Sequence, residues 1–135
     1  MTIIVCLDNN NGMLFNHRRQ SRDANVIKDI EGTVGDSIVF TNSYSEPLFA
    51  GAKVKLKIAD DFLSAAENND FCFVENTSVK IYEDRITKLI IYKWNRDYPS
   101  DFRFDIDYGN YFKLESSVDF VGTSHEKITK EVYVR

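Results

Sequence analysis

The residues with the clearest chemical potential in this sequence lie between positions 17 and 23. Asp23 stands in the first turn of a segment whose apolar residues, Val26, Ile27 and Ile30, have helical spacing. A carboxylate in such a place can orient an amino-pyrimidine-like ring through two hydrogen bonds. Alternatively, Asp23 only stabilises the start of the helix through the helix dipole. Asp23 is therefore the leading candidate for a catalytic or binding residue.

Three arginines, Arg18, Arg19 and Arg22, follow His17 and surround the start of the same helix. Such a cluster can clamp a phosphate group or a nucleic-acid backbone. The alternative is a solvated loop whose charges are balanced by nearby acids, and the net charge of −4 favours that alternative. The same net charge disfavours a general nucleic-acid binder, because such proteins normally carry a basic excess.

The sequence lacks the spacings of several familiar catalytic sites. His17 and His125 are its only histidines, and no zinc-binding spacing of histidine and cysteine occurs, so we expect no metal site. No phosphate-binding loop and no Gly-x-Ser-x-Gly turn is present. Cys6 and Cys72 lie in apolar runs and are predicted to be core residues in a reducing compartment.

The elements that must position these residues begin with an apolar strand at 2–7, which a polar loop with a turn at Gly12 follows. The sequence predicts Ser21 as the N-cap of a helix over 22–31. Short helices are expected at 45–49, 60–67 and 77–82, the last capped by Thr77. Further strands are expected at 37–41, 54–58, 71–74, 89–94, 102–106, 111–114 and 130–135, with a turn at Gly109-Asn110.

Strands and helices alternate as far as residue 94, and antiparallel strands follow. This order predicts a single three-layer α/β domain over residues 1–135, with a mixed, mostly parallel sheet, short helices on both faces and an antiparallel C-terminal end. No apolar run is long enough to span a membrane, so we expect a cytoplasmic protein without membrane contact. Lysines in the edge strand at 54–58 favour a monomer or a weak dimer.

This order of elements resembles the dihydrofolate reductase family. The run from Ile3 to Gly12 is similar to that family's first strand and glycine turn, and 71–94 and 131–135 are similar to later strands and a helix. The resemblance implies that Asp23 holds and helps to protonate a pterin. It also implies a cleft bordered by Cys6, Leu7, Ile27 and Tyr92, and it places Gly12, Glu75, Asn76 and Thr77 at cofactor-binding positions.

The departures from the family fall on the cofactor positions. The resemblance implies a glycine pair for the dinucleotide phosphates where this chain has Glu75 and Asn76. A like-charge contact at roughly 4 Å costs about 1–4 kcal/mol, so Glu75 disfavours NADPH. The family's second phosphate-binding run is replaced by Thr41-Asn42-Ser43-Tyr44, which contains no cation.

Three functional hypotheses follow. The first is a ligand-binding or accessory module that has lost NADPH-dependent reduction and whose cleft holds a small planar or phosphorylated ligand. The second is a diverged pterin or folate reductase that uses Asp23, with Arg18, Arg19 and Arg22 replacing the lost phosphate contacts. The third is an RNA- or protein-interaction module that uses the same arginines.

Overall fold

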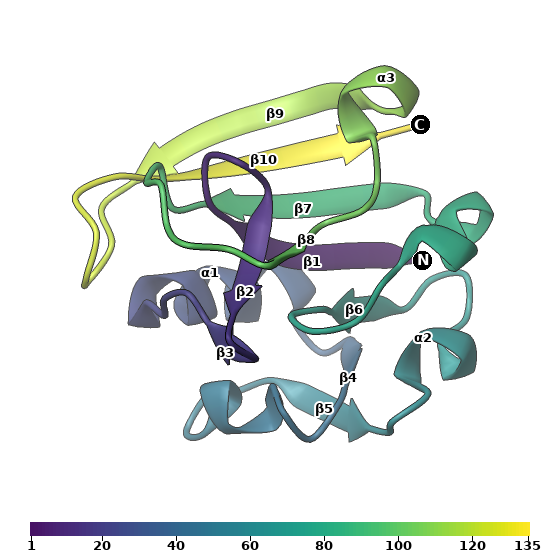
Figure 1. Ribbon diagram of the computed structural model, residues 1–135. Helices are drawn as coiled ribbons and strands as arrows, with labels where there is room; N and C mark the ends of the chain where they lie inside the picture. Colours follow the sequence, from purple (N-terminus) through teal and green to yellow (C-terminus); the bar gives the residue numbers. More distant parts are fainter.

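The computed structural model describes residues 1–135 and is built around a seven-stranded sheet in the order β5-β4-β6-β1-β7-β10-β9 (Figure 1). Neighbouring strands from β5 to β7 run parallel, whereas β10 and β9 extend the sheet in antiparallel fashion. This is the mixed, mostly parallel sheet with an antiparallel end that the sequence predicts. The strands are β1 (Thr2–Leu7), β4 (Ile38–Thr41), β5 (Lys55–Ile58), β6 (Phe71–Phe73), β7 (Lys88–Lys93), β9 (Lys113–Phe120) and β10 (Ile128–Val134).

Two hydrophobic cores lie on opposite faces of this sheet, because successive side chains of a strand point to opposite sides. On β1, Ile3, Val5 and Leu7 pack in one core, while Ile4 and Cys6 face the other. Helix α2 (Phe62–Ala65) and the residues flanking the 3₁₀ helix η2 (Lys80–Arg85) contribute to the core of Leu7. Helix α1 (Ala24–Val34) and the 3₁₀ helix η1 (Glu46–Phe49) cover the other face, so helices lie on both faces as predicted (Figure 1).

The predicted long loop after β1 is instead a β-hairpin. Strands β2 (Gly12–Phe15) and β3 (Arg18–Arg19) pair, and β8 (Phe102–Arg103) joins β2 in a second, three-stranded sheet. This small sheet lies in front of the large one in Figure 1. Asn16 and His17 form the turn with φ of 52° and 63°. No glycine marks this turn, which is why sequence reasoning missed the hairpin.

Helix α1 starts and ends later than predicted. Asp23, not Ser21, is the N-cap: its backbone is extended and its carboxylate accepts a hydrogen bond from the Asn25 N–H at 2.9 Å. The helix continues past Gly32 to Val34. A glycine inside a helix costs about 1 kcal/mol, and the burial of Val34 offsets that cost.

The remaining corrections fall in the second half of the chain. Thr77 does not cap a helix, since η2 begins only after Val79 and is a 3₁₀ helix. Helix α3 (Tyr108–Tyr111) replaces the predicted turn at Gly109-Asn110, and the strand predicted at 102–106 is only the two residues of β8. Strand β9 extends to Phe120 rather than ending at Leu114, because it pairs with β10 from Lys113 to Phe120. None of the helices has the length and apolar character needed to cross a lipid bilayer.

Candidate functional site

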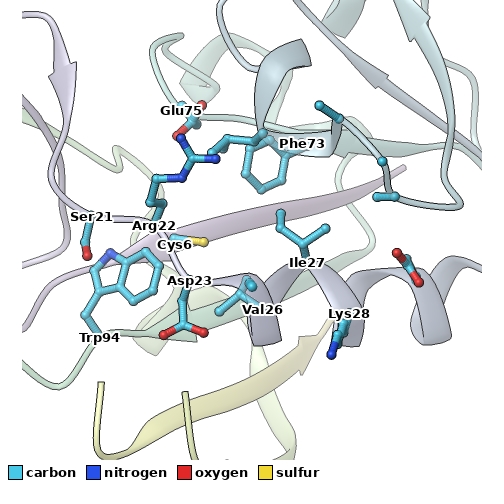
Figure 2. Close-up of a pocket in the computed structure, with 16 residues that line it drawn as sticks. Cys6, Ser21, Arg22, Asp23, Val26, Ile27, Lys28, Phe73, Glu75 and Trp94 are labelled. Carbon is cyan, nitrogen blue, oxygen red and sulfur yellow. The ribbon is translucent and has the colours of Figure 1, made fainter. Parts of the chain in front are cut away.

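A cavity of about 280 Å³ lies between α1 and the carboxyl ends of β1, β6 and β7 (Figure 2). Ligands of open α/β sheets bind outside the carboxyl ends of the strands, which is where this cavity lies. Its position also follows from the alternation of β1, because Cys6 faces α1. The lining residues used below are Cys6, Ser21, Arg22, Asp23, Val26, Ile27, Lys28, Glu31, Leu48, Phe73, Glu75 and Trp94.

The walls of the cavity are mostly apolar. Ile27 projects from α1 towards Phe73, and Trp94 closes the end nearest Asp23 (Figure 2). Trp94 is the only tryptophan in the chain. Burial raises the pKa of the Cys6 thiol, so this sulfur remains a neutral thiol and a weak nucleophile. The cavity therefore offers apolar surface for a ligand to pack against, and its one thiol is unreactive.

The two cationic side chains that line the cavity, those of Arg22 and Lys28, are not held in ion pairs. Arg22 extends towards Glu75 in Figure 2, yet neither Arg22 nor Lys28 forms an ion pair within the protein. Glu31 accepts a hydrogen bond from the Lys53 backbone N–H at 3.2 Å. Arg22 is thus the cavity residue with guanidinium donors free for a ligand.

Asp23 lies in the cavity wall, but its carboxylate is fully used by the protein. One oxygen accepts the N–H groups of Asn25 and Thr123, both at 2.9 Å. The other accepts the Ser124 N–H at 2.8 Å and lies 3.1 Å from His125 Nδ1. Burial alone would raise the pKa of Asp23, but these hydrogen bonds outweigh it and hold the pKa well below its usual range.

This carboxylate fastens α1 to the loop between β9 and β10, which reaches down to the start of α1 in Figure 1. The loop can come this close only because position 122 is glycine. A Cβ on Gly122 would collide with an Asp23 carboxylate oxygen and would lie 2.7 Å from Ile128 Cδ1. Asp23 is therefore an anchor for two segments that are about 100 residues apart in sequence.

His125 is buried beside Asp23, and sequence reasoning had given it no role. Its ring stacks on Trp94 with centroids 4.6 Å apart and planes at 19°. Its Nε2 atom lies 3.2 Å from Ser21 Oγ and 3.0 Å from the Tyr98 hydroxyl. Only the tertiary fold brings these residues together, and no local pattern around His125 could have revealed it.

Glu75 is not an isolated negative charge. Its two oxygens accept Arg19 Nε at 2.9 Å and Arg19 Nη2 at 3.0 Å, and Ser45 Oγ donates to it at 2.7 Å. Hydrogen bonding to Glu75 raises the pKa of Arg19. The guanidinium also lies 4.7 Å from the centre of the Tyr44 ring. The predicted repulsion of a phosphate by Glu75 is therefore largely cancelled, but Arg19 is committed to this pair.

The structure separates the other predicted site residues. Leu7 lies in the opposite core, because it alternates with Cys6. Tyr92 is buried and does not line the cavity, and its hydroxyl donates to Asp29 at 2.5 Å. Arg18 is exposed on the hairpin, and Gly12, Asn76 and Thr77 do not line the cavity.

Gly12 is required by close packing and not by its backbone conformation. Its φ is not positive; the residue with φ of 61° in this turn is Asn11. A Cβ at position 12 would lie 2.6 Å from Gln20 Nε2 and 2.7 Å from Ser100 Cβ. Glycine therefore permits close packing of the hairpin on the 95–100 loop. No group of three or more histidine, cysteine or acidic side chains is placed to hold a metal ion.

The fold and the cavity together define an α/β protein with a ligand-sized pocket at the carboxyl ends of its parallel strands. Among solved structures, the chain is similar to dihydrofolate reductase from Enterococcus faecalis, determined in complex with NADP(H) and RAB-propyl. The TM-score is 0.67 at 13% sequence identity, and the match covers 99% of this chain and 95% of the other. No protein-family model and no curated protein sequence matches the chain. The chain therefore has a dihydrofolate reductase-like fold, as its sequence predicts.

Proposed function

We propose that this protein is a ligand-binding module that accommodates a small planar, anionic ligand in the α1 cavity and does not reduce folate with NADPH. The observation that carries this proposal is that the Asp23 carboxylate is fully hydrogen-bonded within the protein. All four of its hydrogen bonds go to the protein's own backbone and to His125, so no lone pair is left to orient a pterin. The cavity next to it nevertheless remains open.

The lining of the cavity supports a ligand smaller than a typical drug molecule. Its volume of about 280 Å³ matches a single substituted aromatic ring. Ile27, Phe73 and Trp94 provide apolar surface for the ring. Arg22 has donors without a partner and suits a carboxylate or phosphate on that ring.

The residues present do not suit a nicotinamide dinucleotide. The Arg19–Glu75–Ser45 contacts fill the place where the resemblance implies a bare glycine pair. A phosphate there would have to displace Glu75 from Arg19 and leave that carboxylate unpaired. The diverged-reductase alternative also needs Arg19 for phosphate, and Arg19 is already paired.

The two free cysteines fit the cytoplasmic location expected from the sequence.

Trp94 allows a direct test, because the only tryptophan of the chain lines the cavity. We expect 4-hydroxybenzoate and phenyl phosphate to change its fluorescence saturably. Arg22→Gln should weaken this binding about tenfold or more, since a charged hydrogen bond is worth about 1.5–3 kcal/mol. Arg18→Gln is the matched control, because Arg18 is exposed and outside the cavity; it should bind as the wild type does.

Titration with NADPH by calorimetry addresses the reductase alternative. We expect no binding in the micromolar range. Tight NADPH binding, or NADPH oxidation by dihydrofolate that disappears in Asp23→Asn, would refute the proposal. Equal binding of both aromatic anions by wild type and Arg22→Gln would refute the role of Arg22.

A further inference from the structure

The contacts of His125 determine which of its nitrogens carries the proton. The Asp23 carboxylate is ionised and can only accept hydrogen bonds, so His125 Nδ1 must donate to it at 3.1 Å. In the neutral ring, Nε2 is then the acceptor. Nε2 then has one lone pair, and the hydroxyls of Tyr98 at 3.0 Å and Ser21 at 3.2 Å compete to donate to it.

Ser21 differs from Tyr98 in its relation to the cavity. Ser21 lines the cavity and is only half-buried, whereas Tyr98 is not among the lining residues. Figure 2 shows Ser21, Trp94 and Asp23 grouped at one end of the cavity. A hydroxyl that donates to a histidine oriented by a buried carboxylate is the arrangement of an activated serine nucleophile.

From this geometry we infer that Ser21, His125 and Asp23 form a hydrolytic triad that cleaves small carboxylic esters bound in the α1 cavity. Ser21 is the nucleophile, His125 the general base, and Asp23 the residue that orients His125. The inference rests on the proposed binding function, because the cavity must hold the ester next to Ser21. It assigns a reaction and a substrate class to that cavity.

The reaction needs only the ester and water. Ser21 Oγ attacks the carbonyl carbon and its proton passes to His125 Nε2. The bond from the carbonyl carbon to the alcohol oxygen then breaks, and the alcohol leaves with the proton from Nε2. A water molecule next gives a proton to Nε2 and its oxygen to the acyl carbon, which releases the carboxylic acid and restores the Ser21 hydroxyl.

Arg22 supplies donors for the negative charge that develops on the carbonyl oxygen. Its backbone N–H directly follows the nucleophile and has no acceptor in the protein. An N–H at this place in the chain serves as an oxyanion donor in other serine hydrolases. The Arg22 guanidinium is free to hold an anionic substituent of the ester.

The matched ester pair phenyl acetate and 4-acetoxybenzoate, which differ by one carboxylate, tests the inference. We expect hydrolysis of both, with a preference for 4-acetoxybenzoate that Arg22→Gln removes. Ser21→Ala should lower the enzymatic rate by at least about 100-fold, because the nucleophile itself is lost. Arg18→Gln is the control: Arg18 is exposed and lies outside the cavity, so activity should be retained.

A fluorophosphonate probe provides a second, independent readout. We expect stoichiometric labelling that peptide mass mapping places on Ser21 and that Ser21→Ala abolishes. An unlabelled Ser21, in protein whose Trp94 fluorescence still responds to 4-hydroxybenzoate, would overturn the triad and leave the binding function standing. Loss of both signals in folded protein would overturn both.

Discussion

Asp23 illustrates how a polar side chain in the wall of a cavity can serve the fold. It accepts hydrogen bonds from the first turn of α1 and from the loop between β9 and β10. Ionised carboxylates that accept several N–H bonds are strongly stabilised relative to their protonated form. The same bonds place His125 against Trp94 and Ser21, so one residue supports both the cavity wall and the proposed triad.

Asp23→Asn should destabilise the protein by about 3 kcal/mol near neutral pH, because an amide cannot accept the charge-assisted bonds of the carboxylate. The folded protein holds the pKa of Asp23 below the ordinary value of about 3.9. Its stabilising contribution is therefore complete above that value and is lost as the pH falls through the lower folded-state pKa.

Urea unfolding of both proteins near neutral pH and at about pH 3 checks this. The stability difference should be largest near neutral pH and should shrink in acid. Comparing the two proteins removes the contribution of the other titrating groups that they share. A difference that stays constant with pH would contradict the role given to the ionised carboxylate.

Among the elements, the β2–β3 hairpin is the one whose turn chemistry matters most. Its strand β3 places Arg19 next to Glu75, and Gly12 of strand β2 packs closely against Gln20 and Ser100. Its two turn residues, Asn16 and His17, both have positive φ. Asparagine tolerates this conformation, but a left-handed histidine costs about 1–2 kcal/mol.

His17→Gly should therefore raise the free energy of unfolding by up to about 1 kcal/mol, because glycine adopts positive φ without a Cβ penalty. His17→Ala is the matched variant, since it removes the ring but keeps the Cβ, and should differ little from the wild type. Thermal unfolding of the three proteins measures the effect. An alanine variant as stable as the glycine variant would show that the turn is not under backbone strain.

In the molecule as a whole, the two ends of the large sheet differ. Strand β5 at one edge carries Lys55 and Lys57. Strand β9 at the other edge is exposed along nearly its whole length and has a bulge where its pairing with β10 shifts between Val132 and Tyr133. Charges and bulges at edge strands hinder pairing with a second sheet.

We therefore expect the protein to be a monomer at micromolar concentration in sedimentation equilibrium. If a dimer formed, the exposed apolar side chains of Leu114 and Val118 on β9 would be the contact surface that we expect. A stable dimer that dissociates in Leu114→Lys would contradict it and would place the contact on β9.

The sequence predicts well those elements in which buried positions appear as a regular pattern of apolar residues. The apolar run of β1, the lysine alternation of β5 and the short helix at Glu46–Phe49 are all found where expected. Prediction failed where a neighbour defines the element. Strand β9 is extended to Phe120 by its pairing with β10, and the β2–β3 hairpin turns through Asn16 and His17 without a glycine.

For the site, charge and position pointed to Asp23 and Arg22, and the family resemblance pointed to Cys6 and Ile27; all four line the cavity. The residues next to α1 could be recognised because helix spacing and charge are local properties. The partners of these residues could not: His125 is 102 residues from Asp23, and Glu75 is 56 residues from Arg19. Hydrogen bonds and ion pairs over such separations form only when the chain is folded, so the tertiary structure alone decided that Asp23 is saturated, that Arg19 is paired and that Ser21 meets a histidine.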